Sequence, residues 1–385
     1  MSKIVKIDYI VIIFTKNINI YISMSVRARI LKIEKKIKLI IRYLIYFGIF
    51  FAKERKFKVD LPFYKKLFAW RHGYLGTSFK QYNIDRTNYK TYISDYHRWM
   101  KLPLLNEGYG LILADKELFH DFMYPFSQFV PKIYFEIKKG KLLYNDLLGT
   151  KVCDLLDLVI EKKKLALKPK TSYGGIGFSF IESKGEKFLL GNQQLVTGTA
   201  VMEMVSGLDN YIITDFIQQA DYAQKIFPAA TNTIRVITMY DEELGGAFIA
   251  GAAHRFGTES TQPVDNWTQG GMSASIDLDT GVLGKCALNP KGEYLQWVNR
   301  HPNTEEIITG VQIPNWLYLK QHLLRIVKYV RFCPYIGWDI VITDEGFMVI
   351  EANDCPDIHI VQIHSSLIAN EKAKLFFRKH KIIKI

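Results

Sequence analysis

Three side chains near the end of the chain are of the types that bind a hard metal ion. Asp339 lies in one apolar run, residues 337–343, and Glu351 and Asn353 lie in the next one, residues 347–353. Because side chains alternate between strand faces, Glu351 and Asn353 share a face, and a hairpin places Asp339 roughly opposite Glu351. Two carboxylates and an amide oxygen suit Mg²⁺, which usually shares its other positions with water and phosphate oxygens. The spacing therefore predicts a magnesium and nucleotide site, with a structural hydrogen-bonded cluster as the alternative.

A glycine-rich loop is the second candidate for phosphate chemistry. It follows a predicted strand at residues 165–170 and precedes a returning strand at residues 178–182. Glycines let backbone N–H groups approach a phosphate, and a lysine on the first strand supplies a point charge. No Gly-Lys-Ser/Thr follows and no helix begins here, so the P-loop and the dinucleotide fingerprint are disfavoured. A strand-loop-strand cover over phosphates and an ordinary mobile connection stay open. The residues concerned are Lys168, Ser172, Gly174, Gly175 and Gly177.

A buried arginine is the third candidate. In the predicted strand at residues 232–238, Ile234 and Val236 share one face, and Arg235 projects from the other among apolar neighbours. A guanidinium in such a position needs an anionic partner. That partner is either a carboxylate of the fold or a phosphoryl oxygen of a ligand.

Positive charge is concentrated at the N-terminal end. The 385 residues carry a formal net charge of +13, and residues 1–66 contain 16 Lys and Arg against 4 Asp and Glu. The remainder is nearly neutral, so the basicity points to an anionic partner for the N-terminal segment, most simply a membrane surface. Aromatic residues of this segment cluster between the cations and do not interleave with them, which disfavours base stacking, and we expect no nucleic-acid partner.

An apolar segment at residues 37–52 lies within this basic region. It is shorter than the ~20 apolar residues of a spanning helix, and Arg42 interrupts it. We expect a helix packed on the protein body, with an interfacial membrane helix as the alternative. Residues 1–23 lack a signal cleavage site, and the four cysteines show no disulfide or zinc spacing. These features predict a cytoplasmic protein, at most peripheral at the inner face of the cell membrane.

The remaining patterns predict an α+β architecture. Residues 60–105 read as helices and loops and complete a basic, mainly helical N-terminal region at residues 1–105. Beyond this region we expect a strand at residues 111–114, a helix at residues 117–123 and a strand at residues 211–219.

The order of these parts resembles the ATP-grasp superfamily over roughly residues 110–360. The parts are Asp115-Lys116, Lys168-Pro169 with the glycine loop, Thr214-Asp215-Phe216-Ile217, Asn232-Thr233-Ile234-Arg235, and the Asp339, Glu351 and Asn353 set. Several phrases are similar to the sugar-transfer associated ATP-grasp family found with polysaccharide biosynthesis proteins. These are Asn232-Thr233-Ile234-Arg235, Val264-Asp265-Asn266, Gly270-Gly271 and Ile336-Gly337-Trp338-Asp339. The resemblance implies two α+β lobes clamping ATP, a small lobe at residues 106–210 and a large lobe at residues 211–385.

The resemblance also implies how the residues act. Lys116 and Lys168 would contact phosphates, backbone around Asp215 and Ile217 would meet the adenine, and the glycine loop would close over the phosphates. The three metal-type side chains would hold Mg²⁺. A substrate carboxylate would attack the γ-phosphate, and an amine would displace the resulting acyl phosphate to form an amide. Arg235 would stabilise the charge that develops in both steps.

An acceptor pocket is implied for the segment at residues 254–271. Arg255, Asp265 and Asn266 would line it, and their polar character suits a sugar; an ordinary surface loop is the alternative. Many ATP-grasp ligases carry a Rossmann-like domain ahead of the grasp, and residues 1–105 do not read as one, so the substrates of the peptide and amino-acid ligases are not carried over.

The predicted function is an ATP- and Mg²⁺-dependent carboxylate-amine ligase. It would act on a small-molecule or glycan substrate and form an amide on a sugar or polysaccharide precursor in cell-surface glycan biosynthesis. An ATP-grasp kinase that leaves the phosphoryl group on its acceptor is one alternative. A non-catalytic membrane or nucleic-acid scaffold is the other.

Overall fold

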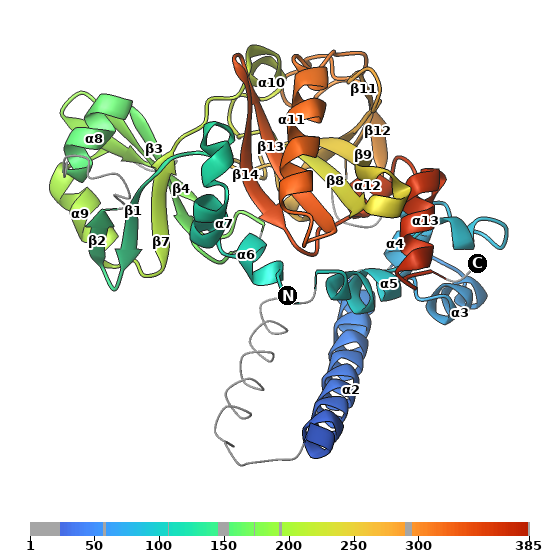
Figure 1. Cartoon of the computed structure of the whole chain (residues 1–385). Coiled ribbons are helices and arrows are strands. Elements are labelled where there is room, and N and C mark those ends of the chain that lie inside the picture. Colours follow the sequence, from blue (N-terminus) through green and yellow to red (C-terminus); the bar gives the residue numbers. More distant parts are fainter. Residues whose placement is uncertain are drawn as a thin grey trace.

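The computed structural model describes residues 24–56, 59–106, 108–144, 154–172, 174–191, 195–288 and 295–383. Two antiparallel sheets, each with seven strands, form the cores of two lobes, and the chain crosses between them after residue 215 (Figure 1). The α+β class and the two lobes expected from the sequence are confirmed. The exact domain limits stay a prediction.

The first sheet forms the small lobe in the order β2-β1-β7-β3-β4-β5-β6. Its strands are β1 (Ile133–Lys138), β2 (Lys141–Tyr144), β3 (Lys164–Pro169), β4 (Ser179–Lys184), β5 (Lys187–Leu190), β6 (Leu195–Val196) and β7 (Tyr211–Asp215). Helices α8 (Leu155–Lys162) and α9 (Gly198–Ser206) cover one face, where Leu165, Leu167 and Ile213 are buried. By strand alternation, Lys168 projects from the opposite face, and it lines a narrow space with Ile350 of the second sheet.

The second sheet forms the large lobe in the order β12-β11-β10-β9-β8-β13-β14. Its strands are β8 (Ile234–Asp241), β9 (Gly246–Phe256), β10 (Met272–Ile276), β11 (Leu283–Leu288), β12 (Gln296–Val298), β13 (Tyr335–Thr343) and β14 (Gly346–Asn353). The helices of this lobe are α10 (Asp221–Ile226), α11 (Trp316–Tyr329), α12 (His359–Gln362) and α13 (Glu371–Lys379). Ile234 and Val236 face the core under α11, whereas Ile237 and Met239 face the core under α13. Arg235 therefore projects toward the second of these cores, as its alternation predicts.

The helices that precede β1 pack in different places. Their bounds are α2 (Met24–Lys56), α3 (Phe63–Arg71), α4 (Gly76–Gln81), α5 (Asp95–Met100), α6 (Gly110–Ala114) and α7 (Lys116–Phe122). Helices α3 and α4 pack on that same second face, whereas α6 and α7 contribute Leu113 and Phe119 to the core under α11. Ala69, Phe79 and Leu102 belong to one buried cluster with Ile237 and Phe376. Residues 59–105 thus share a hydrophobic core with the large lobe. Helix α2 is the exception, because it extends away from the body beyond α5 (Figure 1).

One predicted element is wrong and others differ in length. The strand expected at residues 111–114 is helix α6, since a short apolar run fits either a strand or one helical turn. Asp115 ends α6 and caps α7 by accepting the backbone N–H groups of Glu117 and Leu118 at 3.0 and 3.1 Å. The helix expected at residues 37–52 is part of the longer α2.

The predicted localisation rests on two features, the absence of a membrane-spanning helix and the state of the cysteines, which the described residues allow us to examine. Among the described residues, none of the helices combines the length and apolar character that a membrane-crossing segment needs. The described cysteines, Cys286, Cys333 and Cys355, form no disulfide, as expected. Residues 1–23 and Cys153 lie outside the described residues.

The packing of α11 on the second sheet gives a direct test of the fold. Leu323 is fully buried in this interface, whereas Leu317 on the same helix is exposed. We expect Leu323→Ala to lower the free energy of unfolding by about 2–5 kcal/mol, because it leaves a cavity under the sheet. Leu317→Ala is the matched control and should change that free energy by less than about 0.5 kcal/mol. Denaturant unfolding measures both, and equal losses would contradict the packing.

Candidate functional site

The three predicted metal ligands lie together on the β13–β14 hairpin. Asp339 is the register partner of Glu351, and Gly337 is the partner of Asn353, as the sequence predicts. The amide nitrogen of Asn353 lies 3.4 Å from Oε1 of Glu351. Burial, and then the negative charge of Asp339, raise the pKa of the Glu351 carboxyl. The hairpin thus holds two neighbouring buried carboxylates, and the charge of one disfavours ionisation of the other.

Two arginines bind Asp339 from the neighbouring strands. Arg235 is the register partner of Asp339 across β8–β13, and its Nε and Nη2 atoms lie 2.5 and 3.1 Å from the two carboxylate oxygens. Arg255 on β9 places Nη2 3.2 Å from Oδ2. Burial alone would raise the pKa of Asp339, but the charges of Arg235 and Arg255 outweigh it and lower that pKa to about 2. The sequence left open whether Arg235 binds a carboxylate of the fold or a phosphoryl oxygen of a ligand. In the structure Arg235 binds a carboxylate of the fold, that of Asp339.

The predicted acceptor residues divide between two places. Arg255 Nε lies 3.3 Å from Oδ2 of Asp265, which also accepts the backbone N–H and the hydroxyl of Thr233 at 2.8 and 2.6 Å. Arg255 and Asp265 therefore join the charged cluster beside Asp339. Asn266 points elsewhere, because its side-chain amide donates to the carbonyl of Gly174 in the small lobe at 2.7 Å.

The glycine loop is consequently held against the large lobe. Gly174, Gly175 and Gly177 have φ values of +68°, +74° and +79°, which favour glycine. A Cβ atom at Gly175 would come within 2.9 Å of Cγ1 of Val264. Both the backbone conformation and the close approach to Val264 and Asn266 thus require residues without side chains.

Two lysines lie beside Glu351, and one of them also contacts this loop. Lys116 Nζ donates to the carbonyl of Ser172 at 3.0 Å and lies 3.7 Å from Oε2 of Glu351. Lys168 lines the same narrow space as Lys116. Burial, and then the positive charge of Lys116, lower the pKa of Lys168 to about 8. The lysines and carboxylates thus form a mixed-charge cluster between the lobes.

The side chain of Asp215 forms its hydrogen bonds with the small lobe. Its Oδ1 accepts the hydroxyl of Tyr134 at 2.7 Å, and its Oδ2 accepts the backbone N–H of Lys132 at 3.1 Å. These bonds tie β7 to β1. If a nucleotide contacts this part of the chain, the contact is therefore expected from the backbone that follows β7.

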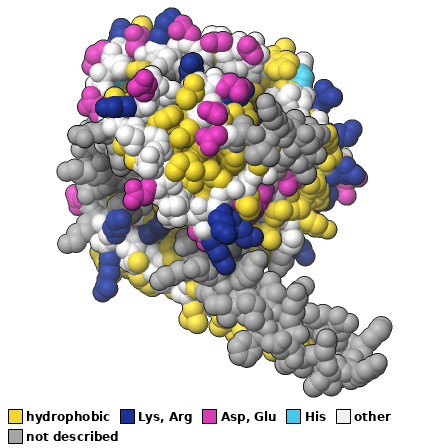
Figure 2. Space-filling view, turned by 90° about the vertical axis from the view of Figure 1, so that its left-hand side faces the viewer, with side chains coloured by type: hydrophobic (Ala, Val, Ile, Leu, Met, Phe, Trp, Pro, Cys, Tyr) yellow, Lys and Arg dark blue, Asp and Glu magenta, His cyan; other side chains and the backbone are white. Residues whose placement is uncertain are grey.

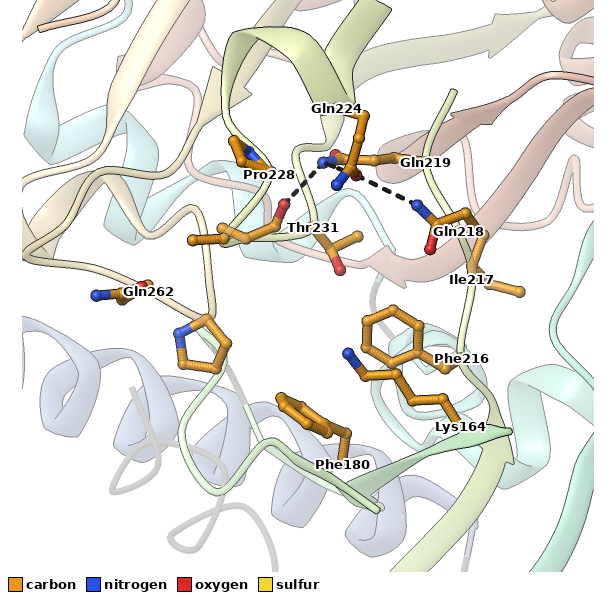
Figure 3. A pocket seen from close by; sticks show the side chains of 13 residues that line it. Lys164, Phe180, Phe216, Ile217, Gln218, Gln219, Gln224, Pro228, Thr231 and Gln262 are labelled. Carbon is orange, nitrogen blue, oxygen red and sulfur yellow. Dashed lines mark hydrogen bonds between the residues drawn. The ribbon is translucent and has the colours of Figure 1, made fainter. Parts of the chain in front are cut away.

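Ile217 lines a cavity of about 230 Å³ between the lobes (Figure 3). Lys164 places its ammonium group 3.9 and 4.1 Å from the ring centroids of Phe180 and Phe216. The large lobe contributes the opposite wall, including Gln262 and the segment that begins at Pro228. Aromatic rings beside a lysine can stack on a planar heterocycle. Strand alternation could have found Phe180, because it pairs with Ala166 and shares the face of Lys168.

An arginine from the N-terminal region also reaches the cluster, although no pattern in the sequence indicated it. Arg98 on α5 binds Asp357 with an Nη2–Oδ2 distance of 2.7 Å, and Nη1 of Arg235 donates to the carbonyl of Asp357 at 3.3 Å. Burial would raise the pKa of Asp357, but Arg98 outweighs it and lowers that pKa to about 2. Only the fold brings α5 beside β8.

The donor chemistry of the hairpin fits a hard cation. Within the described part of the chain, no three His, Cys, Asp or Glu side chains form a metal-ligand group, so the amide of Asn353 has to complete any set with Asp339 and Glu351. An all-oxygen set of this size suits Mg²⁺, which keeps several waters. Both oxygens of Asp339 already bind arginines, which leaves Glu351 as the less compensated carboxylate.

Comparison with known proteins gives a family match. A model of sugar-transfer associated ATP-grasp proteins matches residues 102–374, a range that contains all the site residues named above except Arg98. No curated protein matches the chain.

Several solved structures resemble the chain at low identity. A RimK domain ATP-grasp protein from Sphaerobacter thermophilus is 13% identical with a TM-score of 0.34, over 68% of this chain and 67% of that one. D-alanine–D-alanine ligase from Bacillus anthracis, complexed with ATP, is 13% identical with a TM-score of 0.35, over 73% and 70%. N5-carboxyaminoimidazole ribonucleotide synthetase from Thermotoga maritima is 10% identical with a TM-score of 0.34, over 68% of this chain but only 50% of that one.

The two carboxylates of the hairpin should respond oppositely to neutralisation in the ligand-free protein. Asp339→Ala leaves two guanidinium groups without their carboxylate, and we expect it to lower the free energy of unfolding by about 3–5 kcal/mol. Glu351→Gln removes a carboxylate whose ionisation is disfavoured in the folded state, and we expect a gain of about 0.5–2 kcal/mol at neutral pH. Denaturant unfolding at pH 7 measures both changes.

The pH dependence follows from the directions of the two pKa shifts. The raised pKa of Glu351 favours the folded state in acid and loses this effect as the pH rises through the folded pKa, so the gain from Glu351→Gln should shrink toward pH ~4. The lowered pKa of Asp339 stabilises the fold above pH ~4, and this stabilisation is lost as the pH falls toward 2. A loss of stability in Glu351→Gln at neutral pH would show that Glu351 is a structural partner of Lys116.

Proposed function

The chain belongs to the sugar-transfer associated ATP-grasp family and is an ATP-dependent enzyme of the ligase class, and we propose that it forms an amide on a sugar or polysaccharide precursor. One observation carries the proposal. Lys116 of α7 and Lys168 of the small lobe lie beside the Glu351 carboxylate of the large lobe, which in turn neighbours Asp339. This is the charge pattern that a magnesium-bound triphosphate requires, with cations for its oxygens and carboxylates for the metal.

The nucleotide would lie between the lobes. The base would enter the cavity beside Phe180, Phe216 and Ile217, and the phosphates would extend toward Lys168 and Lys116. To admit a base, the ammonium of Lys164 has to leave its place between the two rings. The glycine loop, already in contact with Asn266, would cover the phosphates from above.

The oxygen ligands of the β13–β14 hairpin support the proposal that the site binds Mg²⁺. Asp339, Glu351 and Asn353 would hold it, and Glu351 in particular lacks a full counter-charge in the ligand-free protein. When bound, Mg²⁺ supplies neutralisation of the phosphate oxygens and holds them in position.

The proposed reaction has two displacements. A carboxylate oxygen of the substrate attacks the γ-phosphorus of ATP, the bond to the bridging oxygen breaks, and ADP leaves. An amine then attacks the acyl carbon, inorganic phosphate leaves, and the amine loses a proton. Arg235 and Arg255 remain cationic and stabilise the charge on the phosphoryl oxygens and on the tetrahedral oxyanion. Because positioning and charge are sufficient, no side-chain nucleophile is required.

The proposal that the substrate carboxylate belongs to a sugar is supported by the family match and by the polar side chains beside Asp339. Arg255, Asp265 and Thr233 present charged and hydroxyl groups beside Asp339, and such groups suit the hydroxyls of a saccharide. The carboxylate would be placed near Arg255, which is the more accessible arginine of the pair.

Product analysis tests the ligase activity. We expect purified protein, MgATP, a panel of uronic acids and a panel of amines to yield ADP, free phosphate and an amide in equal amounts, detected by mass spectrometry and phosphate release. Glu351→Ala should lower turnover by at least about 100-fold. Leu317→Ala, a substitution at an exposed position on α11, is the control for effects of mutagenesis and purification and should keep the wild-type turnover. A phosphorylated product without free phosphate would establish a kinase, and binding without turnover of any carboxylate would reject the saccharide substrates tested.

Proton linkage tests the contact between Lys168 and the nucleotide. The pKa of Lys168 is about 8, and a bound phosphate raises it, so binding a non-hydrolysable MgATP analogue at pH 8 should take up about half a proton. The uptake should vanish well below pH 7, where Lys168 is already charged. Calorimetry in two buffers with different ionisation enthalpies measures it.

Lys168→Arg is the matched control for this linkage. Arginine stays charged at pH 8, so this variant should bind without the uptake. The same uptake in Lys168→Arg and in the wild type would show that another group supplies the linkage.

A further inference from the structure

Helix α2 has one face that packs on the body. Tyr46 and Phe50 are buried against Trp99 and neighbouring residues of α5, and the hydroxyls of Tyr43 and Tyr96 are 2.8 Å apart. The spacing of these α2 residues, three and then four positions, defines a single stripe. This inner stripe accounts for the attachment of α2 and occupies only its C-terminal half.

Helix α2 carries a second, longer apolar stripe, which lies roughly 100° around the helix axis from the inner stripe and whose C-terminal members, Phe47 and Phe51, border a hollow with Trp70. The side chains of this second stripe are all between 43% and 67% exposed. They recur with the alternating spacing of three and four residues and so form one line of about 32 Å along the helix. We call these residues the outer stripe: Ile30, Ile33, Ile37, Ile40, Leu44, Phe47 and Phe51. A contiguous apolar line of this length on a helix that projects from the body marks an interaction surface.

The charge of α2 selects the partner. Residues 24–56 contain ten Lys and Arg and only two Glu. Lys36 and Lys38 flank Ile37 and lie outside the outer stripe by helical spacing. By contrast, the face of the small lobe seen in Figure 2 intersperses basic and acidic side chains. A strongly cationic helix with an apolar line fits an anionic, partly apolar surface.

We propose that the outer stripe of α2 docks into the interfacial region of an anionic membrane, with the helix lying in the membrane plane. The apolar side chains would enter the boundary between headgroups and acyl chains, and the flanking lysines would extend to lipid phosphates. A second copy of the chain is a poorer occupant, because pairing two α2 helices would bring together two segments with the same strong positive charge.

Docking would also place the candidate site near the membrane. The inner stripe of α2 packs on Tyr96 and Trp99 of α5, and Arg98 of the same short helix binds Asp357 beside Arg235. The docked helix and the charged cluster are therefore joined through one packed element. The proposal itself does not depend on the ligase activity.

Vesicle sedimentation of the full chain tests the proposal. The probes are vesicles of phosphatidylcholine alone and of phosphatidylcholine with phosphatidylglycerol at a roughly two-to-one ratio. We expect binding to the anionic vesicles that weakens in high salt, and much weaker binding to the neutral ones. Leu44→Glu removes an inserted side chain and adds a negative charge. We expect it to lower the partition coefficient between anionic vesicles and water by about tenfold or more.

Leu317→Glu is the matched control, because Leu317 on α11 is 63% exposed and Leu44 is 67% exposed. The control should bind within about twofold of the wild type, and circular dichroism should show both variants folded. Absence of wild-type binding to anionic vesicles, or equal losses in the two variants, would overturn the proposal. So would sedimentation velocity showing a lipid-independent dimer that Leu44→Glu separates, since the outer stripe would then bind a second copy.

Discussion

The ion pair between Arg235 and Asp339 is the interaction on which the candidate site depends. The two residues are register partners on neighbouring interior strands of the second sheet, so the fold buries both charges together. A buried pair adds little net stability, but loss of either member leaves an unpaired charge. The pair keeps Asp339 ionised, and this charge in turn disfavours ionisation of Glu351. A bound cation would therefore favour the ionised form of Glu351.

The two lobes meet at this cluster through few contacts. Lys116 touches both the carbonyl of Ser172 and the carboxylate of Glu351, and Asn266 holds the carbonyl of Gly174. These links are polar and small, so a ligand can replace them without exposing a hydrophobic core. A nucleotide between the lobes would exchange lysine–carboxylate contacts for lysine–phosphate and carboxylate–metal contacts.

The N-terminal region is an integral part of the large lobe. Its residues share the core on the face of the second sheet from which Arg235 also projects, and Arg98 supplies a charge beside Arg235. Only α2 stands apart, attached by its inner stripe and exposing its outer one. The same region therefore supports the site on one side and presents a cationic apolar surface on the other.

Local alternation let the sequence by itself determine the β13–β14 hairpin, the pairing of Asp339 with Glu351, and the face of Arg235, because strand periodicity fixes which side chains point together. It failed at residues 111–114, where four apolar residues fit a helix as well as a strand and the cap at Asp115 decides. Only the tertiary structure decided which carboxylate Arg235 binds and that Arg98 lies nearby. The physical reason is that periodicity specifies faces, whereas partners far apart in the chain are set by how those faces pack.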